Sequence, residues 1–177
     1  MSPEAFSEWE EQQTVRHEYA DGTVVAMPGG TRIHSRLATN LILLLGEALR
    51  STPCQVHGPD MRVAVTPTRF VYPDLSVVCD DEVFFDARQT TLANPTLVVD
   101  VLSPSTALAD RGGTFEAYCG VAWLREIVFV EPGRQSVGVY RRGAPWTLHE
   151  AEAGVVALDS VGVSVEVAAL YAGTGVA

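Results

Sequence analysis

Lysine is absent from this 177-residue chain, and all 12 of its basic residues are arginine. This absence excludes a P-loop lysine, a Schiff base and a lysine general base. The chain also carries 22 acidic residues and a formal net charge of −10. An acidic chain is a poor general binder of nucleic acid, because neutralisation of phosphates dominates that affinity. Composition alone therefore excludes several common catalytic devices.

Cysteine and long apolar runs are also scarce. Cys54, Cys79 and Cys119 are scattered and form no Cys-x-x-Cys pair, which indicates neither a disulfide framework nor a zinc ribbon. The acidic first residues do not resemble a signal peptide, and the longest dense apolar run, residues 41–45, is too short to span a membrane. We therefore expect a protein of the reducing cytoplasm with no membrane partner.

The length and the apolar pattern predict one mixed α/β (α+β) domain over residues 1–177. An apolar stripe at helical spacing predicts the main helix at 31–50, and Asp21-Gly22 predicts a hairpin between 16–20 and 23–27. Pro73 predicts a break, so that the strand after it begins at Asp74. Further strands are expected at 55–57, 61–65, 96–102, 125–130, 136–142 and 146–150, and further helices at 2–11, 107–119 and 165–171.

Two aspartates are the first candidates for chemistry. Asp100 lies inside the apolar run TLVVDVL of residues 96–102, where a carboxylate is costly unless it is paired, hydrogen-bonded or bound to a metal. Asp74 precedes a second strand rich in β-branched residues. Two acids at the ends of neighbouring strands can share a divalent cation, and such oxygen ligands suit Mg²⁺ or Mn²⁺. The alternatives are a turn or cap role for Asp74 and a core ion pair with an arginine for Asp100.

A series of segments, in order along nearly the whole chain, resembles the Uma-type putative restriction endonuclease family of the PD-(D/E)XK nuclease superfamily. The resemblance implies a restriction-endonuclease-like fold: a mixed central sheet flanked by helices, here with an extra N-terminal hairpin and C-terminal strands. It also implies metal-dependent hydrolysis of DNA phosphodiester bonds. The matching segments are 16–22 (RHEYADG), 60–62 (DMR), 72–75 (YPDL), 99–106 (VDVLSPST), 110–112 (DRG) and 115–118 (FEAY), together with His34 and Asn40.

The resemblance implies roles for single residues. Asp74 and Asp100 would bind Mg²⁺ or Mn²⁺ together with the main-chain carbonyl of Val101. His34 on the main helix would face the cleft, and Glu18 in the hairpin would add a carboxylate. The alternatives are a core histidine with a satisfied ring nitrogen for His34 and a solvated strand residue for Glu18.

The chain departs from the family pattern in two places. Aspartate stands at position 100, where the family usually has the longer glutamate. The superfamily lysine would stand at Leu102, and in this family it has usually moved to the next helix, at the position of Thr114. Arg111, one turn earlier, would supply positive charge at the phosphate but no proton transfer, because guanidinium stays protonated at neutral pH. Two hypotheses stay open: a weak Mg²⁺-dependent endonuclease, and a catalytically silent binding or regulatory module.

The expected partners are DNA and a second copy of the chain. A DNA-binding cleft requires positive charge near Asp74, supplied by arginines 32, 36, 62, 69 and 111. A homodimer is expected because two sites are needed to cut both strands of a duplex, and because Val137, Val139 and Trp146 predict an apolar sheet edge.

Two geometric expectations follow. Asp74 and Asp100 should lie roughly 4–8 Å apart, as ligands of one cation do. On the helix that follows Asp100, residues three and four apart share a face, so that Arg111, Thr114 and Tyr118 should overlook the two acids.

Overall fold

The structure is a computed structural model that describes residues 1–27, 29–103 and 109–177, with all their side chains except those of residues 109–112. Within these residues, a six-stranded sheet has the strand order β11-β10-β9-β8-β6-β3. Strands β6 and β8 are antiparallel, whereas β8 and β9 are parallel. The strands are β3 (Gln55–His57), β6 (Leu75–Val78), β8 (Leu97–Val101), β9 (Glu126–Val130), β10 (Val137–Arg141) and β11 (Thr147–Ala151).

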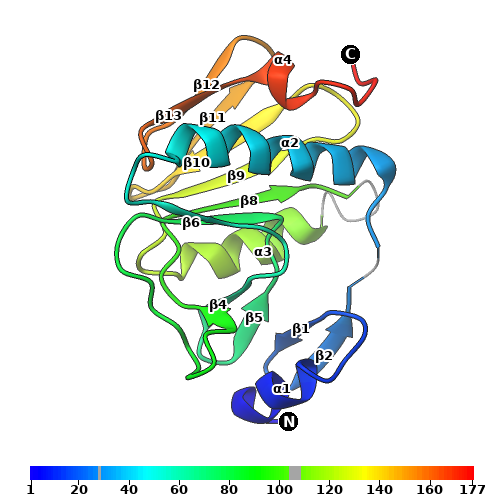
Figure 1. The fold of residues 1–177 in the computed structure, drawn as a ribbon, viewed down its shortest axis with the longest axis vertical. Coiled ribbons are helices and arrows are strands. Elements are labelled where there is room, and N and C mark those ends of the chain that lie inside the picture. Colours follow the sequence, from blue (N-terminus) through cyan, green and yellow to red (C-terminus); the bar gives the residue numbers. More distant parts are fainter. Residues whose placement is uncertain (28, 104–108) are drawn as a thin grey trace.

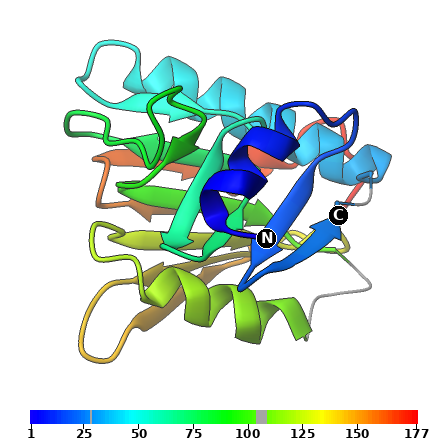
Figure 2. The same cartoon turned by 90° about the horizontal axis from the view of Figure 1, so that it is seen from below.

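Two helices cover opposite faces of this sheet. Helix α2 (Arg32–Leu49) lies on one face and α3 (Ala109–Cys119) on the other, as Figures 1 and 2 show. Successive side chains of a strand point to opposite faces, so Val99 of β8 packs with Leu41 of α2 whereas Val98 packs with Tyr118 of α3. The central strand is therefore covered on both faces, which is what its nearly continuous apolar sequence predicts.

A second sheet carries the N-terminal part of the chain. Helix α1 (Pro3–Glu10) is capped by the Ser2 hydroxyl and packs on this sheet through Phe6, whose ring stacks on Tyr19 at a centroid distance of 4.9 Å. Figure 2 shows α1 beside the hairpin of β1 and β2. The strand order is β2-β1-β5-β4-β7, with β1 (His17–Ala20), β2 (Thr23–Ala26), β4 (Arg62–Thr66), β5 (Arg69–Val71) and β7 (Thr91–Leu92).

Two predictions about the backbone are confirmed. Asp21 and Gly22 have φ angles of 47° and 92°, the pair of left-handed residues that a two-residue hairpin turn requires. The chain also breaks at Pro73, because β5 ends at Val71 and β6 begins at Leu75. This break places Asp74 directly at the start of a central strand.

The C-terminal part differs from the prediction. Strands β12 (Val155–Leu158) and β13 (Val163–Glu166) form an antiparallel ribbon that was not expected, and the expected helix at 165–171 is reduced to α4 (Val167–Leu170). The ribbon is stabilised by packing on the α2 side of the core. Such tertiary packing cannot be predicted from the local sequence. The cap expected for α3 lies largely outside the described residues. None of the helices in the described ranges is both long and apolar enough to cross a membrane.

The expectation of unpaired cysteines is wrong for two of the three residues. Cys54 and Cys79 form a disulfide, and Cys119 is free. Gln55 pairs with Val78 across β3 and β6, and continuing this antiparallel register by one residue places Cys54 opposite Cys79. The count and spacing of cysteines in the sequence do not reveal this strand register. Disulfides persist in oxidising surroundings, so the cysteines do not support the expectation of a cytoplasmic protein.

The apolar sheet edge expected for a dimer is also wrong. Strand β10 is an inner strand, and Val137 and Val139 are buried in the core. Trp146 is half-buried, and the Arg142 guanidinium lies 4.7 Å from the centre of its ring. The edge strands of the central sheet are β3 and β11, and most residues of β11, the neighbour of β10, are exposed. The alternating valines of β10 therefore indicate a strand with one buried face, and they do not indicate an exposed strand at the edge of the sheet.

Candidate active site

Strands β6 and β8 bring the two candidate aspartates together. Leu75 pairs with Val99, and continuing this antiparallel register by one residue places Asp74 opposite Asp100. The main-chain N–H of Val101 donates a 2.8 Å hydrogen bond to Oδ2 of Asp74. The main-chain N–H of Asp74 in turn donates to the Asp100 carboxylate. Both carboxylates line the same cavity.

Burial and like charge act together on Asp100. Burial, followed by the negative charge of Asp74, raises the pKa of Asp100 to about 7. A hydrogen bond from the Tyr118 hydroxyl of α3 opposes this shift, and the charge of Glu18 adds a smaller contribution in the upward direction. A carboxylate in this setting gains more from a nearby cation than an exposed one does.

His34 is the third charged group at this edge of the sheet. It lies in the first turn of α2, whose capping residue Thr31 accepts a hydrogen bond from the His34 N–H at 3.2 Å. The ring Nε2 is 3.2 Å from Oδ2 of Asp74. The hydrogen bond to Asp74 raises the pKa of His34; burial opposes the shift, and the Val101 carbonyl adds to it. His34 thus contacts the carboxylate and approaches the carbonyl that the resemblance assigns to a metal.

The cavity at this edge has a volume of about 170 Å³. Glu18 of β1 and Thr114 of α3 line it from two further elements. Together with Asp74, Asp100 and Val101, five of the residues expected at the site therefore line one cavity. The side chain of Arg111 lies outside the described part of the chain. Among the residues that the structure describes, the lining is Glu18, Met27, Tyr72, Asp74, Asp100, Val101, Leu102, Ser103, Thr114, Tyr118 and Phe129.

Tyr72 is a residue of the site that sequence reasoning missed. It lines this cavity and also a second one, of about 240 Å³, on the side of α1. Its hydroxyl donates a 3.3 Å hydrogen bond to Oε1 of Glu10, and burial raises its pKa to about 12. The position of Tyr72 two residues before Asp74, across Pro73, was the available signal.

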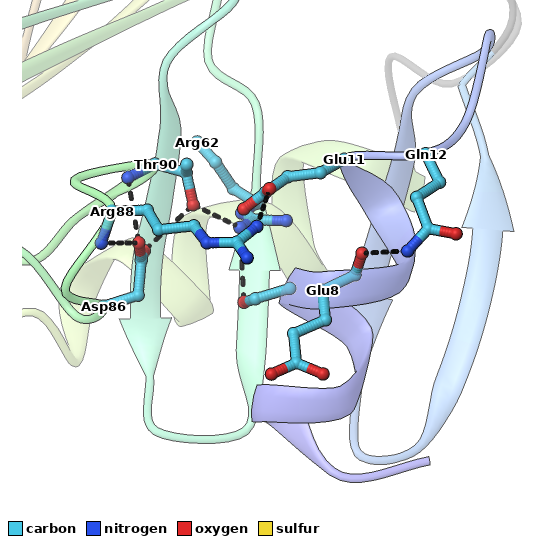
Figure 3. Close-up of polar contacts among 8 residues, drawn as sticks. Glu8, Glu11, Gln12, Arg62, Asp86, Arg88 and Thr90 are labelled. Atoms are coloured by element: carbon cyan, nitrogen blue, oxygen red, sulfur yellow. Dashed lines mark hydrogen bonds and ion pairs between the residues drawn. The ribbon is translucent and has the colours of Figure 1, made fainter.

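Arg62 is among the arginines that a DNA-binding cleft near Asp74 would require, but its side chain is buried elsewhere. Only 2% of its surface is exposed, and its guanidinium donates hydrogen bonds to the hydroxyls of Thr91, Ser7 and Thr90. Figure 3 shows it between Thr90 and Glu11, next to α1. The side chain therefore holds α1 against the second sheet, a role that its motif position did not reveal.

The donor set fits a hard divalent cation. Two carboxylates and a main-chain carbonyl are all oxygen ligands, and Mg²⁺ is typically bound by one or two carboxylates with water and substrate phosphate completing its shell. Within the described residues, no three side chains of His, Cys, Asp or Glu converge in metal-binding geometry. The residues present thus fit a two-carboxylate Mg²⁺ or Mn²⁺ site better than a closed zinc site, which takes four protein ligands.

The six-stranded sheet with a helix on each face defines a mixed α/β protein. A crystal structure described as a putative nuclease belonging to DUF820, from Anabaena variabilis ATCC 29413, matches with a TM-score of 0.74 and 15% identity. The match covers 90% of this chain and 91% of that one. It confirms the fold class expected from the sequence.

The chain belongs to the Uma2 family, described as putative restriction endonucleases, whose model matches residues 3–168. Two curated relatives come from Synechocystis sp. (strain ATCC 27184 / PCC 6803 / Kazusa). The uncharacterized protein slr1290 is 34% identical over 178 residues, covering 98% of this chain and 92% of the relative. The uncharacterized protein sll1609 is 29% identical over 144 residues, covering 80% and 81%. The resemblance found in the sequence motifs is thereby confirmed.

Proposed function

We propose that this protein is a Mg²⁺- or Mn²⁺-dependent DNA endonuclease that hydrolyses phosphodiester bonds. The observation that carries the proposal is the juxtaposition of Asp74 and Asp100 in one cavity, where burial and like charge raise the pKa of Asp100. Such a pair is unfavourable by itself and becomes favourable when a cation is shared. Family membership supports DNA as the substrate.

Asp74, Asp100 and the Val101 carbonyl would hold the cation. When bound, such a cation activates a water molecule and neutralises charge on the scissile phosphate. His34 and the Val101 N–H both donate to Asp74 and so fix the direction of its carboxylate. Tyr118 does the same for Asp100. In this proposal Glu18 adds a further carboxylate to the cleft, and Arg111 supplies positive charge for the phosphate.

A second candidate function is that of a catalytically silent binding or regulatory module. The observation in its favour is that Thr114, at the family's usual lysine position, does line the cavity. A hydroxyl cannot supply the positive charge that an ammonium would bring to the phosphate. The silent module would keep metal and DNA binding without efficient cleavage.

Cleavage of supercoiled plasmid and of single-stranded DNA, with Mg²⁺ or Mn²⁺ under single-turnover conditions, tests the proposal. We expect slow cleavage by the wild type and at least a hundredfold loss in Asp74→Asn and Asp100→Asn, about 2.7 kcal/mol of barrier. Asp159→Asn is the matched control, because Asp159 is 64% exposed and pairs with Arg141. Cleavage that survives both site substitutions would exclude this site. Metal and DNA binding without cleavage would establish the silent module.

We further propose that the active form is a homodimer, because cleavage of both strands of a duplex calls for two sites. The edge strand β11, where Leu148 is 46% exposed, is available for pairing with a second copy. Analytical ultracentrifugation at micromolar concentration should show a dimer that Leu148→Glu dissociates. A wild-type protein that sediments only as a monomer would refute this part of the proposal.

A further inference from the structure

A groove of about 320 Å³ lies on the outer side of the first half of α2, away from the carboxylates. It is lined by Arg32, Ser35, Arg36 and Thr39 of α2 and by Gly173 of the C-terminal segment. As far as the structure describes the chain, this lining contains two arginines and no acidic side chain. In contrast, the cavity at Asp74 and the one beside Tyr72 both contain carboxylates. In a chain with a net charge of −10, such a concentration of uncompensated positive charge requires an explanation.

Both arginines are held by main-chain carbonyls instead of carboxylates. Arg32 Nη2 donates to the carbonyl of Thr174 at 2.9 Å, and Arg36 Nε donates to that of Ala172 at 3.5 Å. Among the described residues, neither has a carboxylate partner, whereas four other exposed arginines, at positions 16, 50, 88 and 134, each form an ion pair. Arg125 is also exposed and has no ion pair within the same residues, but it stands alone, whereas Arg32 and Arg36 line one groove. Both guanidinium groups therefore contact carbonyls of the C-terminal segment, more closely for Arg32 than for Arg36.

Gly173 gives Arg36 the room that it occupies. Its φ is +72°, and a Cβ at this position would lie 3.0 Å from Nη2 and 3.2 Å from Nε of Arg36. Any larger residue would be strained in this backbone conformation and would press on the guanidinium. The tail thus forms a cradle that orients Arg36, and an oriented guanidinium fork matches the geometry of a phosphate.

The groove and the candidate active site lie at the same end of the molecule. Figure 1 shows the beginning of α2, the end of β8 and the C-terminal segment together at this end. His34 is two residues from both Arg32 and Arg36, and residues at this spacing point to nearly opposite sides of a helix. A ligand that is long enough to cross the beginning of α2 would therefore contact both the carboxylate cleft and the groove.

We propose that this groove binds a non-scissile backbone phosphate of a polynucleotide, and that it positions the strand for the cleft on the other side of α2. The inference rests on the proposed function for the identity of the ligand. A free phosphate has the same local chemistry, but it would contact only a shallow, solvated groove. A polynucleotide gains by contacting two sites at once, because the second contact is made at high effective concentration.

The test is fluorescence anisotropy with a labelled DNA duplex in metal-free buffer, using Arg32→Gln, Arg36→Gln and Gly173→Ala. We expect each arginine variant to weaken binding about three- to tenfold, and to lower the slope of log K against log salt by about one. Gly173→Ala should weaken binding in the same direction without any change of charge. Arg50→Gln is the matched control: it removes one charge from the other end of α2, where Arg50 is 75% exposed and paired with Glu47, and should change binding less than twofold. Thermal melts verify that each variant is folded.

The outcomes separate this inference from the proposed function. DNA binding that depends on Arg32 and Arg36 without any cleavage supports the groove and refutes the nuclease. If the protein cleaves DNA, but the arginine and glycine variants change DNA affinity no more than Arg50→Gln does, the groove alone is refuted. A groove that binds inorganic phosphate as tightly as duplex DNA, measured by calorimetry, overturns the polynucleotide as its ligand. A wild type that binds no DNA in the metal-free assay refutes the groove, and the cleavage assay with Mg²⁺ decides the proposed function separately.

Discussion

Nε2 of His34 lies 3.2 Å from Oδ2 of Asp74, the same oxygen that accepts the 2.8 Å hydrogen bond from the Val101 N–H. The beginning of α2 and the end of β8 therefore fix one carboxylate from two directions. A carboxylate held in this way keeps its orientation whether or not a ligand is present. This preorganisation is what a metal ligand requires, because a ligand that must first be ordered loses affinity.

The first prediction concerns the titration of His34. Its hydrogen bond to Asp74 raises the pKa above the ordinary value of 6.5. NMR titration of the metal-free protein should give a pKa above 6.5, which Asp74→Asn lowers and the control Asp159→Asn leaves in place. Because the folded-state pKa is raised, the stability from this pair is fully present below pH 6.5 and is lost as the pH rises through the folded-state pKa. An Asp74→Asn variant with an unchanged His34 pKa would contradict the assigned contact.

The second prediction is a pH-dependent cost of ionising Asp100. The folded-state pKa is raised from 3.8 to about 7. Stability is therefore full below pH 3.8, falls between about pH 4 and pH 7, and stays low above it. Relative to wild type, metal-free Asp100→Asn should gain at least about 1 kcal/mol in the free energy of unfolding between pH 4.5 and pH 8. Denaturation by urea at pH 4.5 and pH 8 measures the free energy of unfolding of both proteins. If the free energies of wild type and Asp100→Asn change in parallel between these pH values, the prediction is wrong.

The third prediction concerns Thr114. A lysine here would bring an ammonium to the cavity that Asp74 and Asp100 line, where it stabilises charge developing on the phosphate. Thr114→Lys should raise single-turnover cleavage at least tenfold, about 1.4 kcal/mol of barrier. Thr114→Met is the matched control, because methionine is similar in length to lysine but carries no charge. Equal rates for the two variants would show that charge at this position is not what limits the reaction.

Arg111→Ala distinguishes the two sources of positive charge. If Arg111 supplied the charge already, wild-type cleavage would be robust and would collapse in Arg111→Ala, and Thr114→Lys would add little. If the charge is missing, Arg111→Ala should leave the weak wild-type rate within about threefold. The same single-turnover assay with identical Mg²⁺ decides between them.

The fourth prediction concerns the disulfide between Cys54 and Cys79, which are separated by 25 positions in the sequence. Replacing both by serine should lower the free energy of unfolding by about 2–4 kcal/mol, because the open chain gains entropy when it unfolds. Cys119→Ser, at the free cysteine, is the control and should have little effect. Chemical denaturation measures both. A double variant as stable as the wild type would show that the bridge contributes nothing.

Local sequence predicted the elements that position the site. The apolar stripe of α2, the Asp21-Gly22 turn and the break at Pro73 each have a local physical cause, and each is present in the structure. The β12–β13 ribbon and the Cys54–Cys79 bridge were missed because tertiary packing and strand register decide them. Arg62 was misjudged for the same reason: its burial depends on hydroxyls that are distant in sequence.

Family resemblance contributed the candidate site, and the structure supplied its geometry. The sequence placed Asp74 and Asp100 at strand ends, and strand pairing brings them opposite each other. Glu18 and Thr114 line the same cavity from separate elements. Helical spacing grouped Thr114 with Tyr118 on one face of the helix, but only tertiary packing brings Glu18 to the same cavity. Tyr72 was overlooked although it stands two residues before Asp74, because an aromatic residue beside a strand is usually part of the core.

Direct titration of the metal-free protein with Mn²⁺, followed by electron paramagnetic resonance and calorimetry, tests the central claim that Asp74 and Asp100 hold a divalent cation. Wild type should bind Mn²⁺ in competition with Mg²⁺, Asp74→Asn and Asp100→Asn should each weaken binding at least tenfold, and Asp159→Asn should match wild type. Equal Mn²⁺ affinity in all four proteins would contradict the claim.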